Sequence, residues 1–392
     1  MKRFRIVVRG AYGEGNFGDL ALAAATAQTL RKSCRPDDFA FLLPAESKVG
    51  DLLPGARCVH KSLEEDVCCD LLLYGGGTQF FSFPLTCRKP DPLRKRLFRR
   101  LVGWLRAARR LKRPFRIRSA RSAAIGIGCG PFVEGSPQQL AAERVFKGLD
   151  FVAVRDLDSA AQCRRWGIPS VCQGADLCYV PGLWRKPGGN SSQPRVKGKE
   201  KIGVIVRDWP HSAEGSAYSE PLLRLVTELR RRGLPADYIL FWELDKVWQT
   251  RLRSAQEQPL IWRADGARGN TIESFLQRLA QFDLFITARY HGAVFGSLLG
   301  KPVLCVDLEP KLRGISEILG DGGSLWKQPF AIPAALRQIS EMLETYPAKV
   351  EKLRTAVARQ SSLASNMEAQ FLAYLERPQR GEASTQHLEP GL

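Results

Sequence analysis

The chain has 392 residues, of which 44% are hydrophobic and 25% are charged, a composition typical of a globular protein with two or three domains. No apolar stretch approaches the ~18 residues of a transmembrane helix, and basic residues interrupt the first apolar run, so neither a membrane span nor a signal peptide is expected. The ten cysteines lack metal-site spacing, and we therefore expect a cytoplasmic protein without disulfides or a metal site.

The first half of the chain alternates short apolar runs with longer amphipathic ones, the pattern of a parallel sheet covered by helices. The apolar runs predict strands at 4–8, 39–43, 70–74, 123–127, 151–154 and 170–172. The amphipathic runs predict helices at 20–32, 93–111, 138–147 and 158–166. We assign residues 1–186 to this N-terminal domain.

Most of the formal net charge of +19 lies in one segment, which contains the predicted helix at 93–111. Residues 88–121 contain fifteen Lys or Arg against a single Asp, a net charge of +14. The apolar face of the helix fits a crossover packed on the sheet, whereas the basic face over 93–113 is a candidate for peripheral contact with anionic lipid at the inner face of the cytoplasmic membrane. No recognition motif accompanies the charge, so nucleic acid is not expected as a partner.

The second half repeats the alternation after a polar, turn-forming linker at 187–200. Its apolar runs predict strands at 202–206, 238–241, 260–262, 284–286 and 303–306, and its amphipathic runs predict helices at 220–232, 245–256, 272–281, 293–299 and 333–344. This C-terminal domain spans 201–346, followed by a helix at 347–376 and a tail at 377–392 whose composition predicts disorder. The fold class is therefore α/β, with two Rossmann-like doubly wound domains that face each other across a cleft.

Two glycine-rich segments follow strands of the N-terminal domain. After the first strand, Gly15, Asn16, Gly18 and Asp19 lead into a helix, where they either line the cleft and offer backbone N–H groups to a ligand, or form a tight turn with Asp19 as the N-cap. The spacing differs from the dinucleotide GxGxxG motif, so NAD is not expected. After the third strand, three glycines either admit a ligand or the opposite domain, or only relieve crowding: Gly75, Gly76 and Gly77.

Cations follow three strands of the C-terminal domain. Arg207 follows the strand 202–206, Arg289 follows the strand 284–286, and Lys311 follows the next strand. Because arginine binds carboxylate and phosphate in bidentate fashion, these cations together predict a site for a small, multiply charged anion. His291, next to Tyr290 at the start of an apolar helix, is the candidate proton donor or acceptor. Taken singly, each arginine could instead be a surface residue and the histidine a structural one.

These residues belong to a longer ordered set of motifs. The set consists of Gly15-Asn16-Phe17-Gly18-Asp19, Gly75-Gly76-Gly77, the segment from Ile125 to Pro131, Val154-Arg155-Asp156 with Ser159, Arg207, Arg289-Tyr290-His291, and the segment from Gly300 to Lys311. In this order the motifs resemble the polysaccharide pyruvyl transferase family, from about residue 6 to residue 312. The chain departs from the family pattern at Tyr290, where leucine is usual, at Leu20, where glutamate is common after Asp19, and at Leu308-Glu309, which replaces Tyr-Asp.

The resemblance implies a GT-B-like fold and an enzyme that needs neither metal nor another cofactor. The implied reaction moves the enolpyruvyl group of phosphoenolpyruvate onto two hydroxyls of a sugar, in a cell-surface polysaccharide or a lipid-linked glycan, to form a cyclic ketal. On this basis His291 is the expected catalytic residue, and the donor is expected at Arg207, Arg289, Tyr290 and Lys311. The glycine-rich segments of the N-terminal domain are expected on the acceptor side.

Two other classes of function fit the same sequence. A glycosyltransferase that uses a nucleotide sugar would share the architecture and would respond to nucleotide sugars rather than to phosphoenolpyruvate. A non-catalytic, membrane-associated scaffold would respond to neither ligand and would depend on the basic helix.

Overall fold

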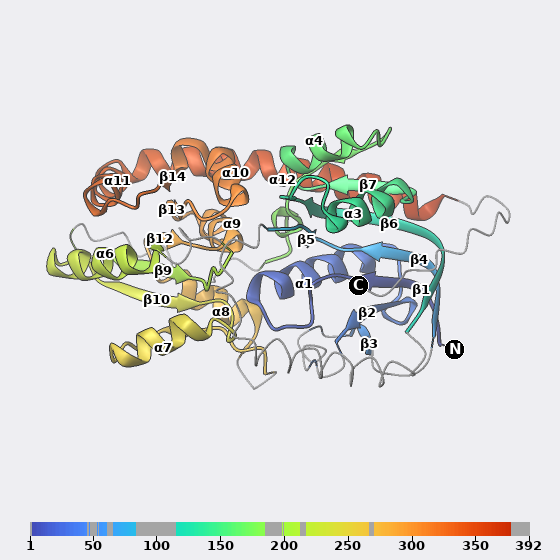
Figure 1. Ribbon diagram of the computed structural model, residues 1–392, viewed down its shortest axis with the longest axis horizontal. Helices are drawn as coiled ribbons and strands as arrows, with labels where there is room; N and C mark the ends of the chain where they lie inside the picture. Colours follow the sequence, from blue (N-terminus) through green and yellow to red (C-terminus); the bar gives the residue numbers. More distant parts are fainter. Residues whose placement is uncertain are drawn as a thin grey trace, which may run out of the picture.

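The computed structural model describes residues 2–44, 47, 53, 55–60, 66–83, 115–184, 198, 200–211, 217–265 and 270–377. The predicted helix at 93–111, most of the predicted linker at 187–200 and the predicted tail beyond residue 377 lie outside the described residues. Figure 1 shows the described part as two α/β halves side by side.

The N-terminal half is built on one parallel sheet with the strand order β3-β2-β1-β4-β6-β7-β8, and β5 pairs with β6. Its strands are β1 (Lys2–Arg9), β2 (Phe39–Leu43), β3 (Arg57–His60), β4 (Val67–Tyr74), β5 (Gly77–Phe80), β6 (Ile117–Cys129), β7 (Phe151–Val154) and β8 (Cys172–Gln173). Its helices are α1 (Phe17–Arg31), α3 (Pro137–Lys147) and α4 (Leu157–Arg165), with short 3-10 turns η1 (Pro36–Asp38) and η3 (Leu177–Tyr179).

The C-terminal half has a second parallel sheet with the order β11-β10-β9-β12-β13-β14. Its strands are β9 (Ile202–Val206), β10 (Ala236–Leu240), β11 (Leu260–Ile261), β12 (Leu284–Thr287), β13 (Val303–Val306) and β14 (Gly323–Trp326). Its helices are α6 (Ser219–Arg231), α7 (Lys246–Ser254), α8 (Ile272–Leu279), α9 (Tyr290–Leu298), α10 (Pro310–Leu319) and α11 (Ile332–Glu344), with the turn η4 (Gly320–Gly322). In both sheets the strand order runs outward from the first strand in two directions, which is the Rossmann arrangement.

The central strands are apolar because helices cover both of their faces. Every residue of β2 and of β9 is buried, so these strands appear in the sequence as continuous apolar runs rather than alternating ones. The surface helix α6 shows the complementary pattern, because its buried residues Leu222, Leu225, Val226 and Leu229 recur at helical spacing.

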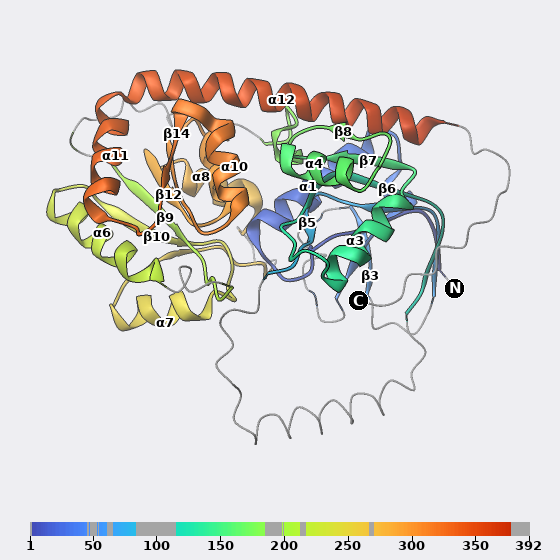
Figure 2. The same ribbon diagram turned by 45° about the horizontal axis from the view of Figure 1, so that its top comes forward.

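The helix α12 (Tyr346–Glu376) lies along both halves, as Figure 2 shows. At its C-terminal end Glu368 accepts a hydrogen bond from Thr29 of α1 (2.8 Å) and pairs with Lys32 (2.6 Å). At its other end Leu353 packs so closely on Gly322 that a Cβ at Gly322 would lie 2.8 Å from the backbone of Leu353. One helix thus joins the two domains on the side shown in Figure 2.

Four elements escaped the sequence-based prediction. The strands β3, β5 and β14 are only four residues long and mix polar with apolar residues, and α10 begins with Pro310 and contains Gly314. The structure also extends α9 to Tyr290, so that His291 lies in its first turn. Among the described residues, no helix combines the length and the apolar character needed to cross a membrane.

Candidate active site

The predicted cations lie at one edge of the C-terminal sheet, where parallel strands end. Arg207 follows β9, Arg289 is the N-cap of α9 behind β12, and Lys311 lies in the first turn of α10 behind β13. Together with Tyr290 and His291 they line one cavity of about 520 Å³. The five residues expected on the donor side therefore share a single cavity.

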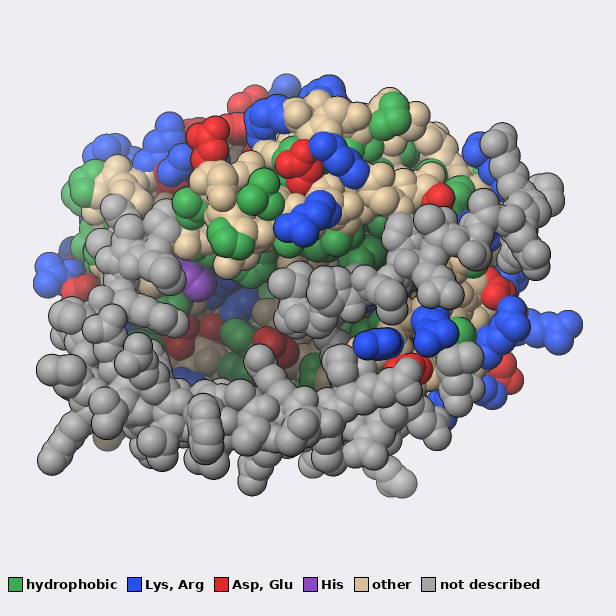
Figure 3. All heavy atoms as spheres, turned by 45° about the vertical axis from the view of Figure 1, so that its right-hand side comes forward, with side chains coloured by type: hydrophobic (Ala, Val, Ile, Leu, Met, Phe, Trp, Pro, Cys, Tyr) green, Lys and Arg blue, Asp and Glu red, His purple; other side chains and the backbone are tan. Residues whose placement is uncertain are grey.

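The N-terminal domain supplies the opposite wall of this cavity. Asn16, Asp19, Thr78 and Arg155 line it, together with Phe81 and other residues of the loops after β1 and β5. Figure 3 shows one face of the molecule that is hollowed, where acidic, basic and hydrophobic side chains gather together with a histidine. The cavity is thus a cleft between the two domains.

Phe17, at the start of α1, holds the two walls together. Its side chain is fully buried, and its ring lies 4.8–5.1 Å from four aromatic rings of the C-terminal domain, those of Phe241, Trp262, Phe275 and Phe295. Its backbone N–H also donates to the carbonyl of Phe241 (2.9 Å). An aromatic side chain of one domain is therefore part of the core of the other, which fixes the geometry of the cleft.

The glycine-rich segment before α1 serves this contact, while its residues Asn16 and Asp19 also line the cavity. Asn16, not Asp19, is the N-cap of α1, because its side chain accepts the N–H of Gly18 (2.9 Å), so the predicted N-cap was wrong. Gly18 lies against His291: a Cβ at Gly18 would meet Nδ1 of the imidazole at 2.2 Å. Gly15, at φ +76°, adopts a left-handed conformation that favours glycine, close to Ala264 of the opposite domain. The segment allows the backbone of one domain to reach the histidine of the other.

The second glycine-rich segment does not line the cavity, contrary to expectation. All three residues are buried, and they make room for side chains of the loop after β1 and of α1. A Cβ at Gly75 would lie 2.1 Å from the hydroxyl of Tyr12, and a Cβ at Gly76 would lie 2.9 Å from Leu22. Gly77, at φ +107°, turns the chain into β5, which carries Thr78 into the cavity. Gly75 and Gly76 therefore allow close packing, and Gly77 allows the turn into β5.

One carboxylate binds two of the cavity's cations. Glu309, the buried N-cap of α10, pairs with Arg207 and lies 3.2 Å from the Nζ of Lys311. Although burial opposes its ionisation, Lys311 and Arg207 lower the pKa of Glu309. Burial lowers the pKa of Lys311 to about 8, against the attraction of Glu309. Two cations that share one carboxylate carry one excess positive charge, and both reach solvent, with side chains that are 22% and 25% exposed.

Arg289 is more enclosed than the sequence suggested. Its guanidinium pairs with the buried Asp245, and its Nε donates to the carbonyl of Val206 (3.3 Å). Burial lowers the pKa of Arg289, and Asp245 opposes this effect. Arg289 therefore contributes to the floor of the cavity, where part of its hydrogen-bonding capacity is already used.

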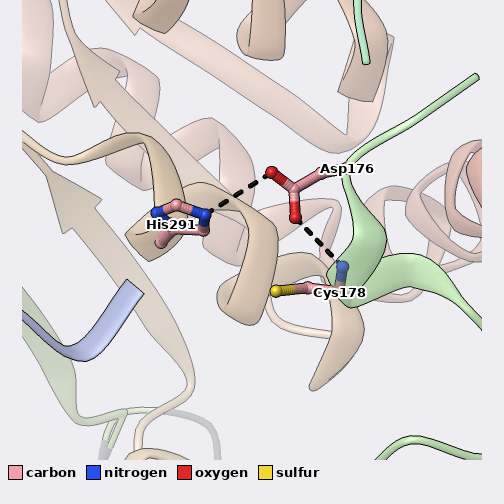
Figure 4. A group of neighbouring side chains, drawn as sticks. All are labelled: Asp176, Cys178 and His291. Atoms are coloured by element: carbon pink, nitrogen blue, oxygen red, sulfur yellow. Dashed lines mark hydrogen bonds and ion pairs between the residues drawn. The ribbon is translucent and has the colours of Figure 1, made fainter. Parts of the chain in front are cut away.

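His291 is held by an acidic residue that the sequence analysis did not single out. Asp176, the N-cap of η3, is fully buried in the N-terminal domain, and its Oδ2 lies 3.4 Å from the Nε2 of His291 and 3.2 Å from the NH1 of Arg155. Its other oxygen accepts the N–H of Cys178 (3.0 Å), as Figure 4 shows. Burial opposes the ionisation of Asp176, but His291 and Arg155 together lower its pKa. The carboxylate thus lies beside the imidazole, within ion-pair distance, across the domain boundary.

The neighbouring Cys178 makes this cluster resemble a metal site. The ligand atoms of Asp176, Cys178 and His291 all lie within 4.8 Å of one another, and Asp, Cys and His are all zinc ligands. However, the guanidinium of Arg155 already occupies the carboxylate and would repel a cation, and burial raises the pKa of the Cys178 thiol. The donor set therefore fits an oriented histidine better than a bound metal.

Arg155 is the second site residue that was not predicted from the sequence, although it lies in one of the motifs that resemble the family. It follows β7, donates to the hydroxyl of Thr78 (2.8 Å) and lies over the ring of Tyr290 (4.2 Å). A cation behind a strand of the N-terminal domain was a usable signal, the same one that identified Arg207. Asp176 had no such signal, because only the folded chain brings it to His291.

Asp19 faces the cations from the opposite wall. Burial raises the pKa of its carboxyl group, whereas His291, Lys311, Arg289 and Arg207 act against this increase. Burial thus opposes the charged form of Asp19, and the cations of the cavity favour it.

Two facing Rossmann-like domains with a polar cleft at the strand ends define the GT-B class of fold. The Anabaena protein Alr3699/HepE in complex with UDP-glucose is similar, with a TM-score of 0.55 at 14% identity, and the alignment covers 96% of this chain and 99% of that chain. Sucrose-phosphate synthase (tll1590) from Thermosynechococcus elongatus gives a TM-score of 0.51 at 12% identity, with 95% and 98% covered. At these identities the likeness concerns the fold alone.

Sequence comparison identifies the family. No curated protein matches the sequence at a significant level. The model of the polysaccharide pyruvyl transferase family, by contrast, matches residues 16–310, about three quarters of the chain and nearly all of the cavity lining. The chain belongs to the polysaccharide pyruvyl transferase family.

Proposed function

We propose that the protein transfers the enolpyruvyl group of phosphoenolpyruvate to two hydroxyls of a sugar, in a cell-surface polysaccharide or a lipid-linked glycan, to form a pyruvate ketal. One observation carries the proposal: four cations and a histidine from both domains line a single cavity of about 520 Å³. Such a cavity has the size of a small-molecule site, and its cations suit a donor that bears both a phosphate and a carboxylate.

The donor first meets the two cations that reach solvent. Arg207 and Lys311 are the more exposed pair and carry the excess positive charge beside Glu309, so they would bind the phosphate. Arg155 and Arg289 are buried behind them and held by Asp176 and Asp245. They would contact the carboxylate and supply fixed positive charge as the transition state develops.

The reaction requires one proton at C3 and two new bonds at C2. His291 would donate the proton to C3, which creates the methyl group and oxocarbenium character at C2. One sugar hydroxyl attacks C2, the bond between C2 and the bridging oxygen breaks, and the second hydroxyl closes the ketal. Of the two hydroxyl protons, one restores His291 and the other leaves with the phosphate as HPO₄²⁻. Asp19 can relay either proton.

The test combines donor binding with turnover. Phosphoenolpyruvate should raise the melting temperature of the wild type, whereas UDP-glucose should not. With phosphoenolpyruvate and a suitable glycan acceptor the protein should release inorganic phosphate. Arg207→Ala should weaken donor binding about ten- to a hundredfold, because a charge-assisted contact is lost. Arg224→Ala, an exposed arginine of α6 paired with Glu220, should bind the donor normally.

Two outcomes would contradict the proposal. Stabilisation by UDP-glucose but not by phosphoenolpyruvate would indicate a nucleotide-sugar transferase. Equal donor affinity in the Arg207→Ala and Arg224→Ala variants would place the donor elsewhere.

A further inference from the structure

Apolar side chains of both domains gather at the mouth of the 520 Å³ cavity. Phe81 of the N-terminal domain is 42% exposed, and Leu244 of the C-terminal domain is 48% exposed. Both line the cavity, as do Phe83, His211 and Trp242. Isolated exposed apolar residues are common, but here they form the rim of a cavity whose floor is charged. We call these five residues, of which four carry rings and Leu244 does not, the aromatic rim.

The rings of the aromatic rim are held in place by one another and by the opposite domain. Phe83 lies 5.3 Å from the ring of Phe81 and stacks on His211 at 4.7 Å. The indole Nε1 of Trp242 donates to the carbonyl of Glu14 (2.7 Å) across the domain boundary. Because the rings are held before any ligand binds, little conformational entropy is lost when something stacks on them.

The aromatic rim is adjacent to the charged floor. The guanidinium of Arg289 lies 5.8 Å from the ring centroid of Trp242, and Asp208, Asn16 and Asp19 line the same cavity. A pyranose has apolar C–H faces and a rim of hydroxyls, so it can stack on aromatic side chains while its hydroxyls face carboxylates and amides. Phosphoenolpyruvate alone has no apolar face that would use these rings.

We propose that the aromatic rim is the acceptor subsite, which binds one pyranose of the glycan by stacking and presents two of its hydroxyls to the donor beside His291. This inference rests on the proposed function, because it assigns the second substrate of that reaction. It also gives a use to the exposed Phe81 and Leu244, which neither donor binding nor packing requires.

A second, larger cavity of about 840 Å³ adjoins the first and shares Thr78, Arg155, Tyr290 and Lys311 with it. It fits an acceptor less well for two reasons. His291 does not line it. Two of its aromatic residues are turned to each other, since Phe132 packs on Trp166 and Trp166 is only 7% exposed. The larger cavity nevertheless provides the matched control, because Leu140 on its wall is 49% exposed.

Saturation-transfer NMR on the full-length protein would test the assignment. The probes are the methyl glycosides of glucose, galactose, mannose, N-acetylglucosamine and N-acetylmannosamine, each in the presence of phosphoenolpyruvate. Loss of one aromatic or aliphatic contact should weaken glycoside binding about two- to tenfold in Phe81→Ala and in Leu244→Ala. Leu140→Ala should bind the glycosides like the wild type. All three positions are exposed, so the variants should fold.

The outcomes separate this inference from the proposed function. If phosphoenolpyruvate does not stabilise the wild type, the proposed function fails, and this inference fails with it. If phosphoenolpyruvate binds but none of the glycosides does, only the assignment of a pyranose to the aromatic rim is overturned. Glycoside binding that is lost in Leu140→Ala and kept in Phe81→Ala and Leu244→Ala would assign the acceptor to the larger cavity. The proposal requires the opposite pattern and unchanged donor affinity in all three variants.

Discussion

Replacing Phe17 by alanine should both destabilise the protein and loosen the active-site cleft. The side chain is fully buried among four aromatic rings of the other domain, at centroid distances of 4.8–5.1 Å. Truncation of a buried phenylalanine costs about 3–5 kcal/mol, and the lost aromatic pairs place this site at the upper end. Because His291 packs on Gly18, the next residue, the imidazole should also lose its fixed position.

Phe39→Ala is the matched control for this experiment. Phe39 is equally buried, but it lies in β2, and its aromatic neighbour Phe41 belongs to the same domain. Urea unfolding should give similar losses of stability for the two variants. Under conditions where both are folded, only Phe17→Ala should lower kcat and weaken the stabilisation by phosphoenolpyruvate. If both variants retain wild-type kinetics, the contact of Phe17 does not fix the cleft and the reasoning is refuted.

Three further predictions concern groups around His291 and Lys311. Gly18→Ala should lower kcat, because the new Cβ would displace the imidazole of His291. Gly314→Ala in α10 should leave kcat unchanged, because nothing lies within 4 Å of the new Cβ. Equal kinetics of the two variants would exclude the steric argument. Asp176→Asn should lower kcat about tenfold or more, with a smaller change in KM for the donor, because the general acid His291 loses the carboxylate beside it. A loss of stability with normal kcat would assign Asp176 a merely structural role. Donor affinity should fall as the pH rises through about 8, because burial lowers the pKa of Lys311 to about 8 and the neutral amine no longer attracts an anion. Lys311→Met should abolish this pH dependence of donor affinity between about pH 7 and pH 9. An unchanged pH profile in the variant would assign the dependence to another group.

The architecture could be predicted from the sequence because its central strands are buried on both faces. The bounds of β2, β7, β9 and β13 agree with the predicted strands, since each is an uninterrupted apolar run between turn-forming residues. The short strands β5 and β14 have no such pattern, because they form only by pairing with β6 and β13. A strand that forms only by pairing with its neighbour has no distinctive apolar pattern in its own sequence.

The site could be predicted only in part. Cations directly behind strands identified Arg207, Arg289 and Lys311, because the topology of a parallel sheet brings such positions together. The buried carboxylates of the site come from unrelated places: Asp245, which pairs with Arg289, precedes α7, and Asp176, which lies beside Arg155 and His291, precedes η3. The function of Gly18 also escaped prediction, because the group that needs the space is a histidine 273 residues further along the chain.

The number of cations in the cavity does not give the net charge that a ligand meets, because carboxylates pair with these cations. A buried guanidinium without a partner is unfavourable by several kcal/mol, so Arg155 and Arg289 remain charged in the cleft because Asp176 and Asp245 accompany them. These pairs are close to neutral and attract a distant anion weakly. Among the described residues that line the cavity, Glu309 is shared by Arg207 and Lys311, which both reach solvent, and the pair of cations carries one excess positive charge there. Donor selectivity should therefore depend more on this one shared carboxylate than on the total number of arginines in the cavity.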